Sequence, residues 1–229
     1  MEIEPRPFRP LERRARVAIT SFWVFIGASA LFAVSLIACI SVGANIYSDV
    51  PYAVEETPAG GVALLSLAVT AIAFFVTFII CSVVFLMWLF RARKNLPALG
   101  ISAVRWSPGW SMAWWFIPIM SLFRPYQVVK ETWQVTDPTS APGEQRSQKL
   151  PSYFVWWWTL YLIYTIGINV TDNYASAVGG DPDLDEAAVL TMIDVIMLLV
   201  GMGAAWNATR IMRDITARQT QRHQVDAFA

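Results

Sequence analysis

Residues 57–90 read TPAGGVALLSLAVTAIAFFVTFIICSVVFLMWLF and contain no Asp, Glu, Lys or Arg. A helix of about 20 apolar residues is long enough to cross a hydrocarbon core roughly 30 Å thick. A second charge-free run covers residues 17–48, and shorter apolar runs at 150–171 and 187–209 contain one charge, Asp194. The pattern predicts an all-α integral membrane protein with four transmembrane helices, at about residues 18–47, 62–90, 152–170 and 187–209.

The composition agrees with a membrane protein. Hydrophobic residues make up 56% of the chain and charged residues only 15%, whereas soluble domains contain roughly 25% charged residues. The first apolar run follows a basic segment, as a signal peptide would. It is about twice as long as the apolar region of a signal peptide, so we expect an uncleaved first helix.

Charge alternates along the chain. All 17 lysines and arginines lie before the first run, between the second and third, or after the fourth. The other two loops carry the acidic residues Asp49, Glu55 and Glu56, and then Asp172, Asp181, Asp183, Asp185 and Glu186. Because basic loops remain on the cytoplasmic side, both termini (1–16 and 211–229) and the segment 91–150 are predicted to be cytoplasmic.

The segment between the second and third runs is rich in tryptophan. Residues 106–133 read WSPGWSMAWWFIPIMSLFRPYQVVKETW. The uncharged part, 106–123, is short for a span, and Pro118 interrupts it. A crossing here would also place the following basic residues outside. We therefore expect a re-entrant or interfacial helix on the cytoplasmic face, with Ser107 as its N-cap and Pro108 as its first residue.

After this element the sequence predicts two further features. The residues that follow Pro125 fit a short amphipathic helix ending near Val135. Residues 137–149 are polar and rich in Pro, Gly, Ser and Gln, which is typical of a loop.

All 11 tryptophans map to the predicted cytoplasmic half, although interfacial tryptophans usually occur on both sides of a membrane. One interpretation is that they anchor and pack the 106–123 element. The other is a docking surface for anionic lipid headgroups, a quinone-like headgroup or a partner protein. The residues expected to form that surface are Arg91, Arg93, Lys94, Arg105, Trp106, Trp110, Trp114, Trp115, Arg124 and Tyr126.

The stretch 88–133 resembles a known family motif. Its elements are Trp88-Leu89, Arg91-Ala92, Asn95-Leu96, Leu99-Gly100, the run from Arg105 to Trp110, the run from Trp114 to Ile119, the run from Arg124 to Gln127, Glu131 and Trp133. This pattern is similar to the core of the bacterial family called domain of unknown function 4328, over roughly residues 60–215. The resemblance implies a bacterial multi-helix membrane protein, and it implies no activity, ligand or catalytic residue. We expect the protein to lie in the bacterial inner membrane.

The sequence offers few residues for chemistry. His223 is the single histidine, so no histidine pair is available for haem or zinc. Cys39 and Cys81 fall toward opposite ends of antiparallel helices and are expected to be packing residues. We predict no catalytic site, no metal, no cofactor and no nucleic-acid partner.

Asp194 is the exception, because a carboxylate inside a span costs about 2.5 kcal/mol or more unless it is protonated, paired or hydrated. It is either an ion or proton site, with Tyr161, Tyr164 or Asn169 as partners, or a hydrogen-bonded residue that ties helices together. Nearby, Gly201 and Gly203 predict close packing of the last helix against another helix.

These observations favour a non-catalytic accessory, assembly or stabilising subunit of a larger bacterial membrane complex, with a membrane-protein partner or a second copy of the chain. The alternatives are a small transporter or channel that uses Asp194, and a membrane protein that binds lipid or quinone.

Overall fold

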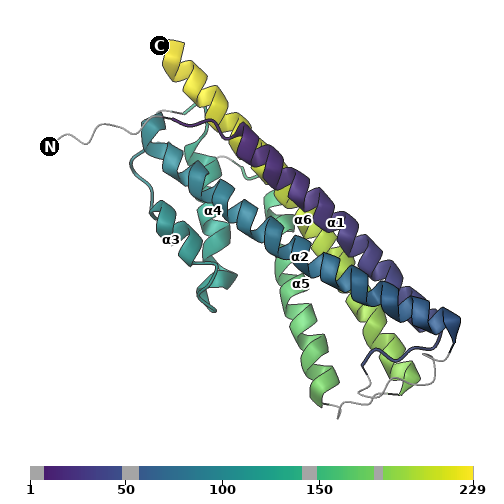
Figure 1. Cartoon of the computed structure of the whole chain (residues 1–229). Helices are drawn as coiled ribbons and strands as arrows, with labels where there is room; N and C mark the ends of the chain where they lie inside the picture. Colours follow the sequence, from purple (N-terminus) through teal and green to yellow (C-terminus); the bar gives the residue numbers. More distant parts are fainter. Residues whose placement is uncertain (1–7, 48–56, 141–148, 178–182, 229) are drawn as a thin grey trace. The chain divides into compact units, whose positions relative to one another are not determined.

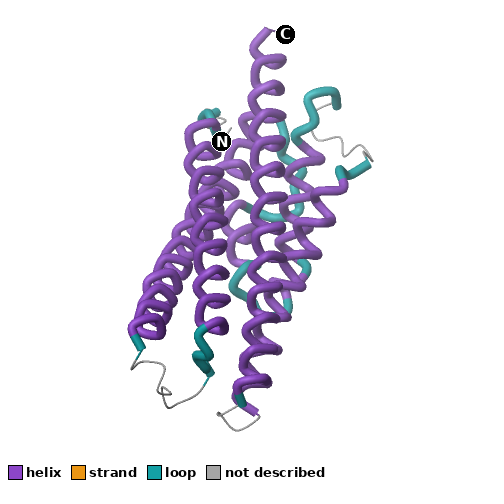
Figure 2. The backbone as a smooth tube through the Cα atoms, turned by 90° about the vertical axis from the view of Figure 1, so that its right-hand side faces the viewer, coloured by secondary structure: helices purple, strands orange, loops and turns teal. Residues whose placement is uncertain are grey.

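The computed structural model describes residues 8–47, 57–140, 149–177 and 183–228. Within them, the regular elements are helices and no strand is present (Figures 1 and 2), which confirms the all-α prediction. Asp49, Glu55, Glu56, Asp181 and residues 141–148 of the predicted polar loop lie outside the described residues. The elements are α1 (Glu12–Ser41), α2 (Pro58–Asn95), η2 (Leu96–Leu99), α3 (Pro108–Ala113), η3 (Met120–Leu122), α4 (Arg124–Val135), α5 (Ser152–Ala177) and α6 (Leu184–Phe228).

Three helices in the described part of the chain are long and apolar enough to cross a membrane. They are Glu12–Ser41, Pro58–Leu99 and Leu184–Val225. The second and third contain the predicted spans 62–90 and 187–209. The first ends at Ser41 rather than at the predicted residue 47, because Gly43 adopts a left-handed φ of 74° that favours glycine and turns follow the helix. The fourth predicted span, 152–170, lies within α5, which has 26 residues.

Both ends of α2 lie outside the predicted 62–90, and a local signal marks each of them. At its start, the Thr57 hydroxyl accepts a hydrogen bond from the Gly60 N–H at 3.1 Å, and Pro58 occupies the first turn. At its other end η2 follows, and Gly100 ends η2 with a left-handed φ of 70° that favours glycine.

The helix α6 extends well past the predicted end at 209, to Phe228. Its polar part buries Ile211, Ile215 and Gln219, which recur every four residues and so share one helix face. Burial of that face explains why the predicted tail 211–229 is helical over most of its length.

The chain folds into two compact units, and the long helices contribute to both. Unit 1 contains residues up to 21, 81–155 and 207–229, and unit 2 contains residues 22–80 and 156–206. The basic and tryptophan-rich segments belong to unit 1. Unit 2 contains the later part of α1, the first part of α2, most of α5 and the first part of α6.

Unit 2 has its core between α1, α2 and α6. Buried residues from α1 and α6 form one cluster, and partly buried side chains of α2 pack against it. The rings of Phe32 on α1 and Phe74 on α2 stack with centroids 5.4 Å apart. Between the same helices, the hydroxyl oxygens of Ser35 and Thr70 lie 2.7 Å apart. Such contacts matter because, in lipid, helix association depends on packing and hydrogen bonds more than on the hydrophobic effect.

Glycines allow α5 and α6 to pack closely in unit 2. A Cβ added at Gly201 would lie 2.9 Å from Cδ2 of Tyr164, and one added at Gly203 would lie 3.2 Å from Cδ1 of Leu160. These distances confirm the close packing predicted for Gly201 and Gly203. By contrast, a Cβ at Gly27 of α1 would meet nothing within 4 Å.

We expect Gly201→Ala to destabilise unit 2, because the new methyl group forces the Tyr164 ring to move. Overpacking of this kind costs about 1–3 kcal/mol. The measurement is the thermal unfolding midpoint of the purified protein in detergent. Gly27→Ala is the matched control, and its midpoint should stay equal to or above that of the wild type. Equal midpoints for Gly201→Ala and the wild type would contradict the close α5–α6 contact.

Unit 1 has a separate core around the end of α2. Leu96, Leu99, Ile101 and Val135 form a buried cluster there. The fully buried Trp88 donates its indole N–H to the hydroxyl of Thr216 on α6, at 3.2 Å. This bond satisfies the single polar group of a large side chain, as a buried tryptophan requires.

Candidate functional site

The candidate site is built on the uncharged residues 106–123, called here the aromatic segment. Ser107 is its N-cap and accepts a hydrogen bond from the Trp110 N–H at 3.4 Å, and Pro108 follows as the first residue of α3. Both features confirm the predicted helix start. The segment is not one helix, however: α3 ends at Ala113, turns follow, and η3 begins at Met120. Pro118 lies in the interruption, where its missing N–H disfavours a continuous helix.

A buried ion pair fixes the start of the aromatic segment. Nη1 of Arg93, near the end of α2, lies 2.9 Å from Oε2 of Glu131 on α4, and the two side chains are 0% and 8% exposed. The other carboxylate oxygen of Glu131 accepts the backbone N–H of Arg105 at 2.8 Å. Nη2 of Arg93 donates to the backbone carbonyl of Trp106. Two helices therefore hold residues 105 and 106 through charge-assisted hydrogen bonds, which are stronger than neutral ones.

Past this anchor, the segment exposes large apolar side chains. Phe116 is 74% exposed, Ile119 70%, Phe123 59% and Trp110 54%. Single exposed apolar residues are ordinary, whereas four of them within one short segment favour a surface that contacts lipid or protein. The segment therefore has an anchored start at Arg105 and Trp106, called here its base. Its exposed side chains Phe116, Ile119 and Phe123 are called here its tip.

Arginine side chains stack on the tryptophans at the base. The guanidinium of Arg124 lies 5.6 Å from the ring centroids of both Trp106 and Trp114, and that of Arg105 lies 5.6 Å from Trp106. Cation–π contacts of this length stabilise by about 0.5–1 kcal/mol at exposed sites. The structure thus brings together Arg105, Trp106, Trp114 and Arg124 of the predicted docking surface. The Trp110 ring joins them, with its centroid 5.0 Å from that of Trp114.

The other five residues of that predicted surface are not shown to join this group. Trp115 packs edge-on against Phe85, with centroids 5.4 Å apart. Lys94 lies over Phe90 at 5.7 Å, and burial raises the pKa of the Tyr126 phenol above its ordinary value. Arg91 is 9% exposed and forms no hydrogen bond through Nε within the described residues. Arg93 is engaged by Glu131 inside the fold, so the docking hypothesis now concerns the other residues.

A second polar network joins α4, α5 and α6 in unit 1. The Asp214 carboxylate of α6 accepts hydrogen bonds from the Trp133 indole and the Tyr153 hydroxyl, both at 2.6 Å. The Arg218 guanidinium lies 3.6 Å from the centroid of the Trp133 ring. These bonds fix α4, and with it the Glu131 carboxylate.

The end of α4 is held by α6 as well. Nη1 of Arg222 donates to the carbonyl oxygens of Val135 and Asp137, at 3.4 and 2.7 Å. The last carbonyls of a helix have no partner within it, so an arginine from another element satisfies them.

Asp137 itself is a charged turn residue. Its carboxylate accepts bonds from the Thr139 N–H and hydroxyl and from the Ser140 hydroxyl. Burial acts to raise the pKa of Asp137, but these bonds and the charge of Arg218 outweigh it, and the pKa lies below its ordinary value of 3.8.

We expect the Asp137 carboxylate to stabilise unit 1 at neutral pH. A lowered pKa in the folded state means that this stabilisation is complete above the ordinary pKa and is lost as the pH falls through the folded value. Asp137→Asn should therefore unfold more easily than the wild type at pH 7, and the difference should shrink as the pH falls below 3.8. Denaturant unfolding in detergent at several pH values measures the difference in unfolding free energy between the two proteins. A difference that does not change with pH contradicts the prediction.

The predicted intramembrane site lies in unit 2. The half-buried Asp194 carboxylate accepts a hydrogen bond from the hydroxyl of Tyr47. The three predicted partners have other contacts. Asn169 donates a hydrogen bond to the Thr165 carbonyl at 2.6 Å. Tyr164 packs at Gly201, and the Tyr161 ring stacks on Trp158 with centroids 5.1 Å apart. A role of Asp194 in ion or proton binding remains a prediction.

Three residues were missed as partners by the sequence reasoning, namely Glu131, Asp214 and Tyr47. One feature of the sequence does single out Glu131, because it is the only acidic residue between Trp88 and Trp133, a stretch that contains several arginines and lysines. Tyr47 gave none, since 147 positions separate it from Asp194. In the described part of the chain, no group of three or more His, Cys, Asp or Glu residues could hold a metal ion.

The chain matches the sequence profile of a protein family. No curated protein and no solved structure is significantly similar to the chain. The sequence profile of one family matches residues 52–217, which include the aromatic segment, Arg93, Glu131 and Asp214. The chain therefore belongs to the family described as Domain of unknown function (DUF4328).

Proposed function

We propose that this protein is a non-catalytic integral membrane protein that acts as an accessory, assembly or stabilising subunit of a larger complex in the bacterial inner membrane. The observation that carries the proposal is the aromatic segment, whose base is held by a buried ion pair and whose tip is exposed. An interaction surface of preformed shape loses little conformational entropy on binding. Exposed aromatic residues are also the residue class that contributes most to binding at protein interfaces.

The proposal includes four spans with both termini in the cytoplasm. Support for the fourth comes from α5, whose 26 residues give a length of about 39 Å, more than a hydrocarbon core of roughly 30 Å requires. Support for the orientation comes from the lysines and arginines, which are absent from the two loops proposed to lie outside.

The hydrogen bond from Tyr47 supports the structural interpretation of Asp194. A carboxylate with a hydrogen-bond donor costs less inside a membrane protein than one without a partner, and the bond joins the residues after α1 to α6. A transporter or channel that uses Asp194 remains the alternative, as does binding of a quinone headgroup at the tryptophans.

We expect substitution at the tip of the aromatic segment to release a partner. The chain carries a C-terminal tag and is purified in mild detergent from its source membrane, and co-purifying proteins are quantified by mass spectrometry. Phe116→Asn combined with Ile119→Asn should reduce recovery of a stoichiometric partner, because an exposed aromatic anchor at an interface contributes about 2 kcal/mol or more.

Val225→Asn is the matched control, since Val225 is an exposed apolar residue of unit 1, at 55%, outside the segment. It should leave partner recovery unchanged. A second control, Asp194→Asn, should also leave recovery unchanged. If no partner co-purifies, or if Asp194→Asn abolishes an ion-dependent flux while the segment variant is silent, the accessory role is wrong.

A further inference from the structure

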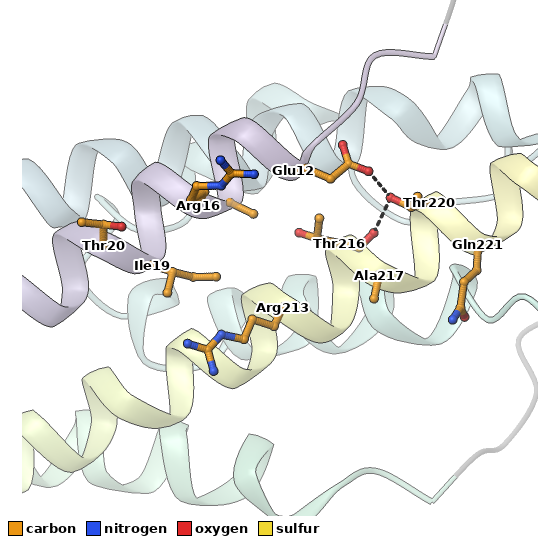
Figure 3. A pocket seen from close by; sticks show the side chains of 10 residues that line it. Glu12, Arg16, Ile19, Thr20, Arg213, Thr216, Ala217, Thr220 and Gln221 are labelled. Carbon is orange, nitrogen blue, oxygen red and sulfur yellow. Dashed lines mark hydrogen bonds between the residues drawn. The ribbon is translucent and has the colours of Figure 1, made fainter.

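A groove of about 580 Å³ lies between the start of α1 and the late part of α6, within unit 1. Figure 3 shows side chains of the two facing helices along it. Its walls carry two arginines, Arg16 on α1 and Arg213 on α6. Apolar surface between them comes from Ile19 and Ala217.

The groove carries an excess of positive charge. Arg16 and Arg213 are exposed, and neither forms an ion pair or hydrogen bond with a described residue. One carboxylate, Glu12, also lines the groove, and it accepts the hydroxyl of Thr220 from the opposite wall (Figure 3). Two guanidinium groups against one carboxylate leave a net charge that suits an anion.

The sequence places both arginines at the ends of apolar runs. Arg16 directly precedes the charge-free run 17–48, and Arg213 follows the run 187–209 by about one helical turn. With the proposed topology, both guanidinium groups therefore lie at the level of the inner-leaflet headgroups, where arginine and lysine bind anionic lipid.

We propose that this groove binds the phosphodiester headgroup of an anionic phospholipid. Arg16 and Arg213 supply the guanidinium groups that bind the phosphate, because a guanidinium forms strong charge-assisted bonds with phosphate oxygens. The apolar surface of Ile19 and Ala217 covers the glycerol and the first carbons of the acyl chains. Thr220, together with Glu12, contacts the outer part of the headgroup.

The mixed character of the groove favours a lipid over a free phosphate ion. A soluble phosphate is fully polar and gains nothing from the apolar side chains that also line the groove. A phospholipid presents a charged phosphate and an apolar body next to each other, and the groove presents the matching pair of surfaces. This inference rests on the proposed membrane orientation and does not depend on a protein partner.

The test measures lipid retained by the purified protein. Native mass spectrometry counts phosphatidylglycerol and phosphatidylcholine bound from mixed micelles of equal content. Arg16→Gln and Arg213→Gln should each lower phosphatidylglycerol binding about fivefold, since one arginine near an anionic surface contributes ~1 kcal/mol. Arg13→Gln is the control, because it removes the same charge from an exposed position on α1 that does not line the groove.

A second variant tests the groove without a change in charge. Ala217→Trp should fill the groove and reduce phosphatidylglycerol binding, whereas Val225→Trp, an exposed position further along α6, should not. A fall of equal size for Arg13→Gln, or no preference for phosphatidylglycerol, would overturn the proposal. Displacement of the lipid by soluble glycerol phosphate at similar concentration would assign the groove to a free phosphate instead. Partner recovery is measured separately, so failure here is distinct from failure of the accessory role.

Discussion

The buried pair of Arg93 and Glu131 is the interaction on which unit 1 depends. Both side chains are withdrawn from water, so each must have a partner, and loss of one would leave an uncompensated charge at a cost of about 3–5 kcal/mol. Nη2 of Arg93 and Oε1 of Glu131 hold the backbone at Trp106 and Arg105. The pair therefore joins α2, α4 and the aromatic segment in one arrangement, and it lets that segment expose apolar side chains without collapsing onto the core.

The other polar contacts of unit 1 support this pair. Asp214 holds α4 through Trp133, and Arg222 satisfies the carbonyls at the end of α4. Both come from the part of α6 that follows its apolar run. The polar end of α6 thus has two faces in use: one binds α4, and the other forms a wall of the groove that we assign to an anionic lipid. The unit combines the groove that we propose for a lipid with the anchored aromatic segment, and both fit the accessory role that we propose.

Much of the helical architecture could be predicted from the sequence, because charge-free runs of this length specify long helices wherever they occur. The Ser107 cap and the close approach at Gly201 were also predictable, since both follow from local chemistry. Glu131 was not recognised as the partner of Arg93, because pairing between residues on different helices leaves no periodic pattern. The helical end of α6 did leave a signal, in the spacing of Ile211 and Ile215, but its polar composition resembled that of a loop.

Amide hydrogen exchange of residues 101–123 is the most direct test of this account. The exchange rates of peptides from this region are compared between the wild type and Glu131→Gln, with Glu186→Gln, an exposed acidic residue at the start of α6, as control. The account predicts faster exchange at Arg105 and through the aromatic segment in Glu131→Gln, and no change in the control. Wild-type protection of the segment in Glu131→Gln would show that the ion pair does not hold it, and would contradict the central claim.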